Sequence, residues 1–135
     1  MRSATDRPFA RVTAYAPELR SVLRIMTGLL FLQHGTQKIL GFPPTANMPS
    51  WLSLSGTAGL IELVGGTLFV LGLFTRPVAF ILSGLMACAY FIAHAPQGFF
   101  PILNRGELAA LYCFVFLYFV AAGPGPWSVD EARRS

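Results

Sequence analysis

The chain has 135 residues, of which 54% are hydrophobic and only 12% are charged. A soluble domain carries about 25% charged residues, so this composition excludes an ordinary water-soluble domain and favours lipid as the solvent. The net charge of +4 does not indicate a nucleic-acid partner, because most of the arginines flank apolar segments, where they set membrane topology.

Residues 1–18 form a polar N-terminal segment, in which Pro17 and Glu18 are typical of a first helical turn. The first span is predicted over about residues 19–40, a segment that becomes polar towards its far end. Residues 41–56 contain three prolines and no charged residue, which predicts an exposed connection.

The second span is predicted over about residues 57–74 and the third over about residues 78–95. Pro96 ends the third span, because the residue before a proline is pushed out of helical geometry. The fourth span covers about residues 107–122, and the following GPGP sequence begins a polar C-terminal tail, residues 123–135.

Lysine and arginine are distributed unequally between the two ends of the spans. One side holds Arg2, Arg7, Arg11, Arg20, Arg24, Arg76, Arg133 and Arg134, and the other holds only Lys38 and Arg105. The richer side is normally cytoplasmic. We therefore predict a single all-α domain over residues 1–135: an antiparallel, up-down-up-down four-helix transmembrane bundle with both termini in the cytoplasm. The arginine-rich start also allows an organellar transit peptide as an alternative.

Ionisable and polar side chains from all four spans collect near the outer end of this predicted bundle. An ionisable group inside a membrane is costly, so it is a functional candidate by default. We predict a ligand-binding pocket in the outer half of the bundle, formed by His34, Lys38, Glu62, Tyr90, His94, Arg105 and Glu107.

Helical spacing predicts which faces line this pocket, because residues three, four and seven apart share a face. The predicted inward faces are Thr27, Leu30, His34, Gln37 and Lys38; Ala58, Glu62, Gly66 and Phe69; Ser83, Ala87, Tyr90 and His94; and Glu107, Leu111, Phe114 and Tyr118. On the fourth span this spacing points Tyr112 away from Glu107.

Structural interpretations stand beside the functional ones. Asn104 and Glu107 fit a capping pair at a helix start, Lys38 and Arg105 can extend to the membrane interface, and Tyr90 is typical of an interfacial aromatic belt. The two histidines can be structural. Arg24 can reach lipid head groups or the carbonyl groups at the end of the second span.

Small residues have simpler interpretations. Gly65, Gly66, Gly72 and Gly84 are expected to be helix-packing contacts, because small residues let helices approach closely in lipid. Cys88 and Cys113 fit small buried fillers, with a redox dithiol as an alternative. No CxxC pair or zinc-ligand spacing is present in the sequence.

Four sequence runs carry a family resemblance: LRIMTGLLFLQHGTQKIL, GLIELVGGTLFVLGLFTRPVAF, FIAHAPQGFF followed by Glu107, and AAGPGPWSVD. Over about residues 20 to 130 they resemble the DoxX family of small bacterial integral membrane proteins. The resemblance implies a multi-pass protein of the bacterial cytoplasmic (inner) membrane. It also implies a likeness to the quinone-linked subunit of thiosulfate oxidation and an association with membrane redox systems.

The favoured function is a redox-linked membrane subunit, belonging to a quinone-linked oxidoreductase, whose pocket binds a quinone or similar small molecule. Such a subunit needs a redox protein partner. The alternatives are a non-catalytic membrane scaffold, binding of a haem or transition metal through His34 and His94, and transport of a small solute. A homo-oligomer is a further alternative, and the lipid bilayer is a partner in every case.

Overall fold

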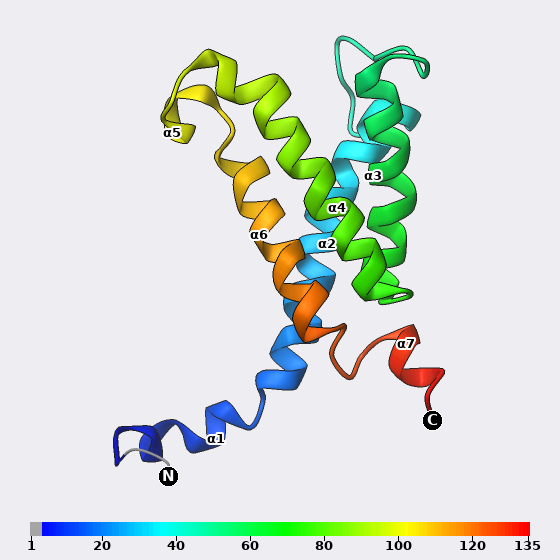
Figure 1. Cartoon of the computed structure of the whole chain (residues 1–135). Coiled ribbons are helices and arrows are strands. Elements are labelled where there is room, and N and C mark those ends of the chain that lie inside the picture. The colour runs from blue at the N-terminus through cyan, green and yellow to red at the C-terminus, as the bar shows by residue number, and fades with distance from the viewer. Residues whose placement is uncertain (1–3) are drawn as a thin grey trace.

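A computed structural model describes residues 4–135, and every regular element in that range is a helix (Figure 1). The all-α prediction is therefore confirmed. In chain order the elements are η1 (Ala4–Phe9), α1 (Ala10–Thr13), α2 (Ala16–Leu40), α3 (Leu54–Leu71), α4 (Thr75–Ala89), η2 (Tyr90–His94), η3 (Ala95–Gln97), α5 (Pro101–Asn104), α6 (Glu107–Ala122) and α7 (Val129–Ala132). η2 is a π-helical turn that continues α4.

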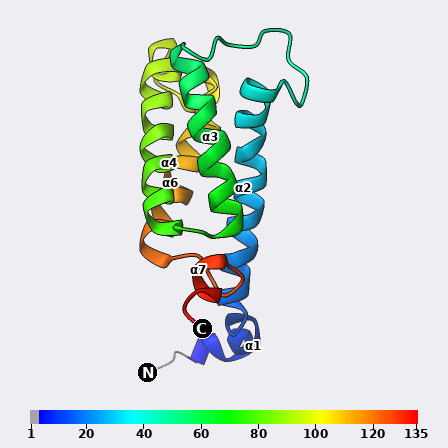
Figure 2. The ribbon, with the colours of Figure 1, turned by 90° about the vertical axis from the view of Figure 1, so that its right-hand side faces the viewer.

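The four long helices, α2, α3, α4 and α6, lie side by side and form what we call the helical body (Figures 1 and 2). Its main contacts join α2 to α3, α4 to α6, and α3 to α4. Successive long helices run in opposite directions, and both chain ends lie at the same end of the helical body. η1 and α1 project away from it.

Local signals set the ends of α2 and α3. Pro17 occupies the first turn of α2, and Gly41 ends that helix with a left-handed φ of 69°. α3 begins at Leu54 because the Ser53 hydroxyl accepts the N–H of Gly56 at 3.0 Å. It ends before Gly72, so the helix lies three residues earlier than the predicted segment 57–74.

Within residues 4–135, two helical stretches have the length and composition to cross a membrane: α3 and the continuous stretch Thr75–Gln97. α6 is apolar but shorter. The outer surface is strongly apolar, because Phe80, Phe91 and Phe114 are each about two-thirds exposed. A large exposed apolar surface of this kind fits contact with lipid. A crossing of the bilayer by all four long helices stays a prediction.

Aromatic rings form the centre of the helical body. Phe31 of α2 and Phe69 of α3 each meet the ring of Phe116 edge-on, with centroids 4.9 and 5.0 Å apart. Phe119 packs on Phe69 in the same manner at 5.2 Å. All four side chains are fully buried. These edge-to-face contacts link α2, α3 and α6 to one another.

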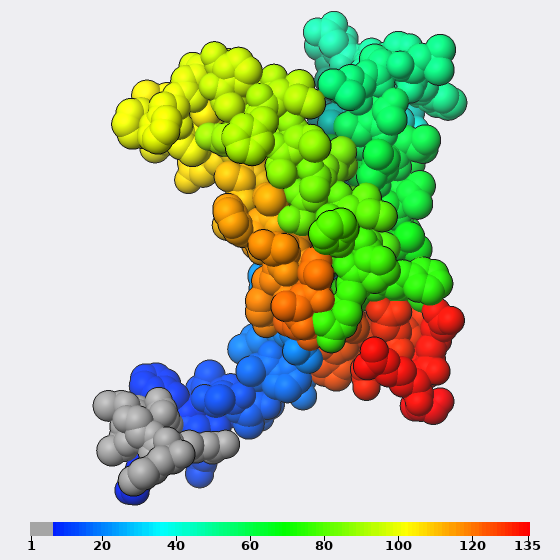
Figure 3. Space-filling view, viewed as in Figure 1, coloured from blue at the N-terminus to red at the C-terminus, as the bar shows by residue number. Residues whose placement is uncertain are grey.

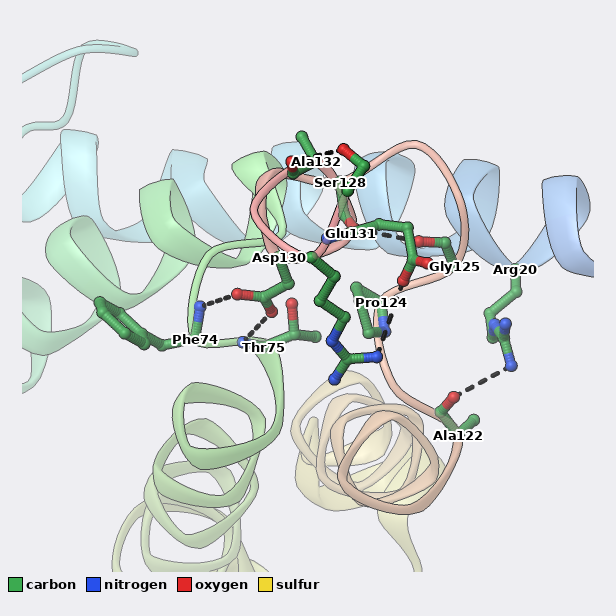
Figure 4. Close-up of polar contacts among 12 residues, drawn as sticks. Arg20, Phe74, Thr75, Ala122, Pro124, Gly125, Ser128, Asp130, Glu131 and Ala132 are labelled. Carbon is green, nitrogen blue, oxygen red and sulfur yellow. Dashed lines mark hydrogen bonds and ion pairs between the residues drawn. The ribbon is translucent and has the colours of Figure 1, made fainter.

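Arginine side chains complete the helix ends on the side of the chain termini. Arg24 is almost fully buried and donates to the carbonyl groups of Phe69, Pro124 and Trp127. Of the two alternatives for Arg24, the structure therefore shows bonding to the end of α3, together with the C-terminal segment. Arg20 donates to the last residue of α6, Ala122, at 3.0 Å (Figure 4).

Hydrogen bonds of Asp130 hold the C-terminal segment against the turn between α3 and α4. Its carboxylate accepts the N–H groups of Phe74 and Thr75 at 2.8 and 2.9 Å (Figure 4), and its own N–H donates to Gly72 at 2.9 Å. These bonds occupy free N–H groups at the start of α4. They hold Phe74 at a left-handed φ of 52°, and Figure 3 shows α7 seated against this turn.

Candidate functional site

A cavity of about 210 Å³ lies at the end of the helical body opposite the chain termini. All four long helices, together with η2 and the residue Arg105, contribute to its wall. The lining residues are Phe31, His34, Lys38, Glu62, Met86, Ala89, His94, Arg105, Leu108, Ala109 and Tyr112. We call this the polar cavity. Five of the seven predicted site residues therefore surround one space, and Tyr90 and Glu107 do not line it.

An ion pair crosses from α2 to α3 at the wall of the polar cavity. The Lys38 Nζ lies 3.0 Å from Glu62 Oε1, with the side chains 27% and 4% exposed. Glu62 Oε2 is buried and has no hydrogen-bond partner among the described residues. A carboxylate this buried needs a partner, and Lys38 supplies one through a single oxygen.

His94 reaches the polar cavity because the end of α4 changes its winding. In η2 the N–H of Ala95 bonds to the carbonyl of Tyr90, five residues earlier. Residues five apart then share a face, so His94 lines the cavity together with Ala89. π-turns of this kind are frequent at functional sites.

A hydrogen bond orients the imidazole of His94. The Nδ1 atom lies 3.1 Å from the carbonyl oxygen of Asn104, so Nδ1 carries the proton and donates. In the neutral ring Nε2 is then an acceptor. His34 enters from α2, and its ring meets Tyr112 edge-on with centroids 6.1 Å apart. The two predicted histidines and a buried phenol thus lie around the same space.

Asn104 organises the segment that joins η3 to α6. Its side-chain amide donates to the Tyr90 hydroxyl at 3.2 Å and to the Gly98 carbonyl at 2.9 Å. Its Oδ1 accepts the N–H of Gly106 at 2.8 Å. Asn104 is fully buried. Tyr90 is therefore a structural partner of this loop and does not line the polar cavity.

The capping interpretation of Asn104 and Glu107 is wrong. Gly106 is the N-cap of α6, and within residues 4–135 no side chain accepts a hydrogen bond from the N–H groups of its first turn. Asn104 instead folds back onto its own loop, because its Oδ1 bonds two residues on. Glu107 is exposed in the first turn of α6, where the helix dipole stabilises a negative charge.

The family-model comparison covers residues 19–95 with the description DoxX. The chain belongs to the DoxX family. Two relatives resemble this chain over most of their length. A protein of Haemophilus influenzae, described only as uncharacterised, is 46% identical over 131 residues, which cover 87% of this chain and 92% of the relative.

A second relative adds the membrane. An uncharacterised membrane protein of Mycobacterium tuberculosis is 30% identical over 128 residues, which cover 81% of this chain and 77% of the relative. DoxX proteins are a family of membrane proteins, so the environment inferred from composition is confirmed for this chain. No solved structure matches this DoxX protein significantly.

The matched region of this DoxX protein contains the residues that α2, α3 and α4 with η2 contribute to the polar cavity, including His34, Glu62 and His94. Helix α6 lies beyond residue 95. The family assignment therefore covers three of the four walls. The fourth wall, with Arg105, Leu108 and Tyr112, is defined by the structure alone.

The predicted inward face of α6 is wrong. Leu111, Phe114 and Tyr118 are exposed, whereas Tyr112, Phe116 and Phe119 are buried. α6 is apolar on every side, so its sequence contains no amphipathic pattern that selects a face. Glu107 was the only polar reference point. Tyr112, a residue of the polar cavity, was consequently missed.

A second cavity lies beside the first in this DoxX protein. It measures about 200 Å³, is almost entirely apolar, and is lined by Lys38, Leu54, Ser55, Ala58, Leu85, Cys88, Ala89, Ile92 and Ala93. We call it the apolar groove. Lys38 and Ala89 line both spaces, so these two side chains form the boundary between them.

Among residues 4–135, no group of three His, Cys, Asp or Glu side chains is placed to hold a metal ion. Cys88 is exposed and Cys113 is half-buried, and both are free thiols. Cys113 instead contacts Ser83, whose hydroxyl donates to the Cys113 carbonyl at 2.8 Å.

Proposed function

We propose that this DoxX protein is a redox-linked subunit of the bacterial cytoplasmic membrane whose polar cavity binds a quinone or a similar small molecule. The observation that carries the proposal is the placement of Glu62, Lys38 and His94 around a cavity with otherwise largely apolar walls. A ligand site of this kind combines an apolar lining with a few convergent polar groups.

The polar groups of the cavity match both redox forms of a quinone. A quinone oxygen accepts hydrogen bonds, and the Lys38 ammonium has three donors, of which one is directed to Glu62. A quinol hydroxyl donates, and the free Nε2 of His94 accepts. Imidazole and carboxylate groups also serve as proton donors and acceptors in general acid–base chemistry. None of the side chains that line the polar cavity carries two electrons, so a redox protein partner has to supply or remove them.

The apolar groove extends this assignment to the ligand's tail. Membrane quinones carry a long hydrocarbon chain, which is stable only in apolar surroundings. The groove adjoins the polar cavity at Lys38 and Ala89. We place the head group in the polar cavity and the first part of the tail in the groove between α3 and α4.

Four membrane crossings with both termini in the cytoplasm are part of this proposal. Three considerations support them: the apolar outer surface, the antiparallel order of the four long helices, and the excess of arginine at the end that holds both termini. In that orientation the polar cavity faces the outer half of the membrane. Cysteines introduced at exposed positions near each end, labelled from one side of intact cells, test this orientation.

The direct experiment is titration of the purified protein with a short-chain benzoquinone and a short-chain naphthoquinone in mild detergent. We expect saturable binding that His94→Ala weakens at least tenfold, because the acceptor Nε2 is lost. Arg11→Gln, at an exposed position on α1, is the matched control. Absence of saturable binding by either quinone would overturn the proposal.

The same sample separates the alternatives. His34 and His94 both line the polar cavity, so a haem held by two imidazoles predicts a strong Soret band that either histidine substitution removes. If the protein is a scaffold without a ligand, the double variant His34→Leu/Glu62→Leu should keep its stability and its association with partner proteins. A ligand site predicts that this variant folds and no longer binds quinone.

A further inference from the structure

A third cavity lies at the opposite end of the helical body, beneath the turn between α3 and α4. It measures about 390 Å³ and is lined by Phe74, Thr75, Arg76, Pro77, Pro124, Asp130, Arg133 and Arg134. We call it the arginine cavity. It brings together three guanidinium groups and one carboxylate.

The single carboxylate of the arginine cavity does not neutralise the arginines. Both oxygens of Asp130 accept backbone N–H groups at the start of α4. Among the described residues, no ion pair joins Asp130 to an arginine within 4 Å. The cavity therefore keeps a net positive charge, and its arginines have free donors.

The three arginines differ in how they are held. Arg76 is anchored by its Nη1 group, which donates to the carbonyls of Val120 and Ala121. Its Nε and Nη2 groups make no hydrogen bond within residues 4–135. Arg133 lies over the ring of Phe74, with Cζ 5.3 Å from the centroid. Arg134 has one partner, Glu131, at 3.8 Å in a largely exposed pair.

We propose that the arginine cavity binds the phosphate group of an anionic phospholipid. A guanidinium group binds phosphate oxygens through paired N–H donors, and basic pockets near a membrane surface recognise anionic lipid head groups. The positive charge and the free donors complement that phosphate.

Apolar side chains beside the arginines favour a lipid over free phosphate. Phe74 is 52% exposed at the rim of the cavity, and Phe80 and Ile81 follow on the exposed side of α4 at 67% and 56%. This exposed apolar path leads from the arginines along α4. An acyl chain attached to the bound phosphate can lie against it, whereas inorganic phosphate gains nothing from such a surface.

The test is native mass spectrometry of the full chain in detergent, titrated with phosphatidylglycerol, phosphatidylcholine or inorganic phosphate. We expect phosphatidylglycerol to bind at least tenfold more tightly than phosphatidylcholine. Arg133→Gln/Arg134→Gln should weaken its binding by about tenfold, because two of the three guanidinium groups are lost. The matched control, Arg7→Gln/Arg11→Gln, removes the same charge from exposed residues at the same end and should change binding less than twofold.

Three results would overturn the proposal: equal losses in the two double variants, equal affinity for the two lipids, or displacement of phosphatidylglycerol by inorganic phosphate at equal concentration. The first indicates a general charge effect, and the last indicates a free-anion site. If the double variant does not fold, Arg134→Gln alone should still weaken phosphatidylglycerol binding about threefold. Quinone binding is measured separately, so this test is independent of the proposed function.

Discussion

Lys38 and Glu62 join α2 to α3 through one ion pair, Nζ to Oε1 at 3.0 Å, in which the side chain of the carboxylate is only 4% exposed. Replacement of only Lys38 leaves a buried charge without a partner. We expect Lys38→Met to lower the free energy of unfolding by about 3 kcal/mol. Lys38→Met/Glu62→Met should recover most of this loss, since apolar packing replaces a buried pair well.

Thermal unfolding of the two single variants and the double variant in one detergent measures this double-mutant cycle. If the effects of the two single substitutions simply add, the ion pair is energetically unimportant. Quinone titration of the double variant then separates stability from binding, because we expect the recovered fold to have lost the ligand.

Gly35 allows α2 and α3 to approach closely. A Cβ atom at this position would lie 2.8 Å from the Cα of Leu63, so Gly35→Ala has to move the two helices apart. We expect a loss of about 1–3 kcal/mol in unfolding free energy, as in overpacked cores. Gly84→Ala is the matched control, because nothing lies within 4 Å of its added Cβ. A similar loss in both variants would contradict this view of the helix contact.

Sequence patterns predicted the helices better than their contacts. The apolar runs and the signal at Pro17 locate the helices, because these are local properties of the chain. The prediction that Gly84 is a packing contact is wrong, since this glycine faces open space. Gly35 was not identified as a packing residue, because only the placement of α3 makes its missing side chain necessary.

The same distinction applies to the candidate site. His34, Lys38 and Glu62 could be placed near each other, because polar residues in apolar helices restrict the inward face. Tyr90 was included because a regular α-helix places it on the face of His94. The π-turn η2 changes that register, and no local pattern in the sequence predicts it. Tyr112 was missed because α6 has no polar face.

Asp130 couples stability to acidic pH. Burial raises the pKa of its carboxyl, but the N–H groups of Thr75 and Phe74 and the charge of Arg133 outweigh burial and lower the pKa below its ordinary value of 3.8. A group with a lowered folded-state pKa stabilises the protein above its unfolded pKa. This contribution is therefore complete above pH 3.8 and is lost as the pH falls through the folded-state value.

Asp130→Asn tests this coupling. We expect a loss of about 1 kcal/mol at neutral pH, as for a weakened helix cap, and a difference from the wild type that shrinks below pH 3.8. Melting temperatures measured across the acidic range, with Glu131→Gln as control, determine it. A constant difference at every pH would show that ionisation of Asp130 has no part in docking α7.

Arg24 satisfies carbonyl groups of both α3 and the C-terminal segment from a position only 1% exposed. Arg24→Met leaves the carbonyls of Phe69, Pro124 and Trp127 without this donor, and each buried unsatisfied group costs about 1–3 kcal/mol. We expect a loss of about 3 kcal/mol or more. The free energy of unfolding of Arg24→Lys should lie between those of the wild type and Arg24→Met, because an ammonium group lacks the planar, forked donors of a guanidinium group.

The free energy of unfolding of these variants is measured in detergent and compared with that of Arg11→Met, a substitution at an exposed position. The C-terminal segment should also become susceptible to protease in Arg24→Met before the helices unfold. Equal stability of Arg24→Met and Arg11→Met would mean that water or detergent replaces the buried guanidinium.

Cys88 reports on occupation of the apolar groove, because it is exposed and lines that space. In a Cys113→Ala background we expect a long-tailed quinone to slow alkylation of Cys88 by N-ethylmaleimide at least fivefold. A short-chain quinone should leave the rate nearly unchanged, since its head group occupies only the polar cavity. Mass spectrometry of the alkylated protein over time gives both rates.

Gly84→Cys in a chain without the two native cysteines supplies the control for this reaction. Position 84 is on the same helix but in open space, so neither quinone should protect a thiol placed there. Ala58→Trp fills the groove, because Ala58 lines it opposite α4, and should abolish long-tail protection while short-chain quinone still binds. If the long-tailed quinone protects Cys88 and the thiol introduced by Gly84→Cys equally, the tail lies on the outer surface. If both quinones protect Cys88 equally, the head group lies in the groove.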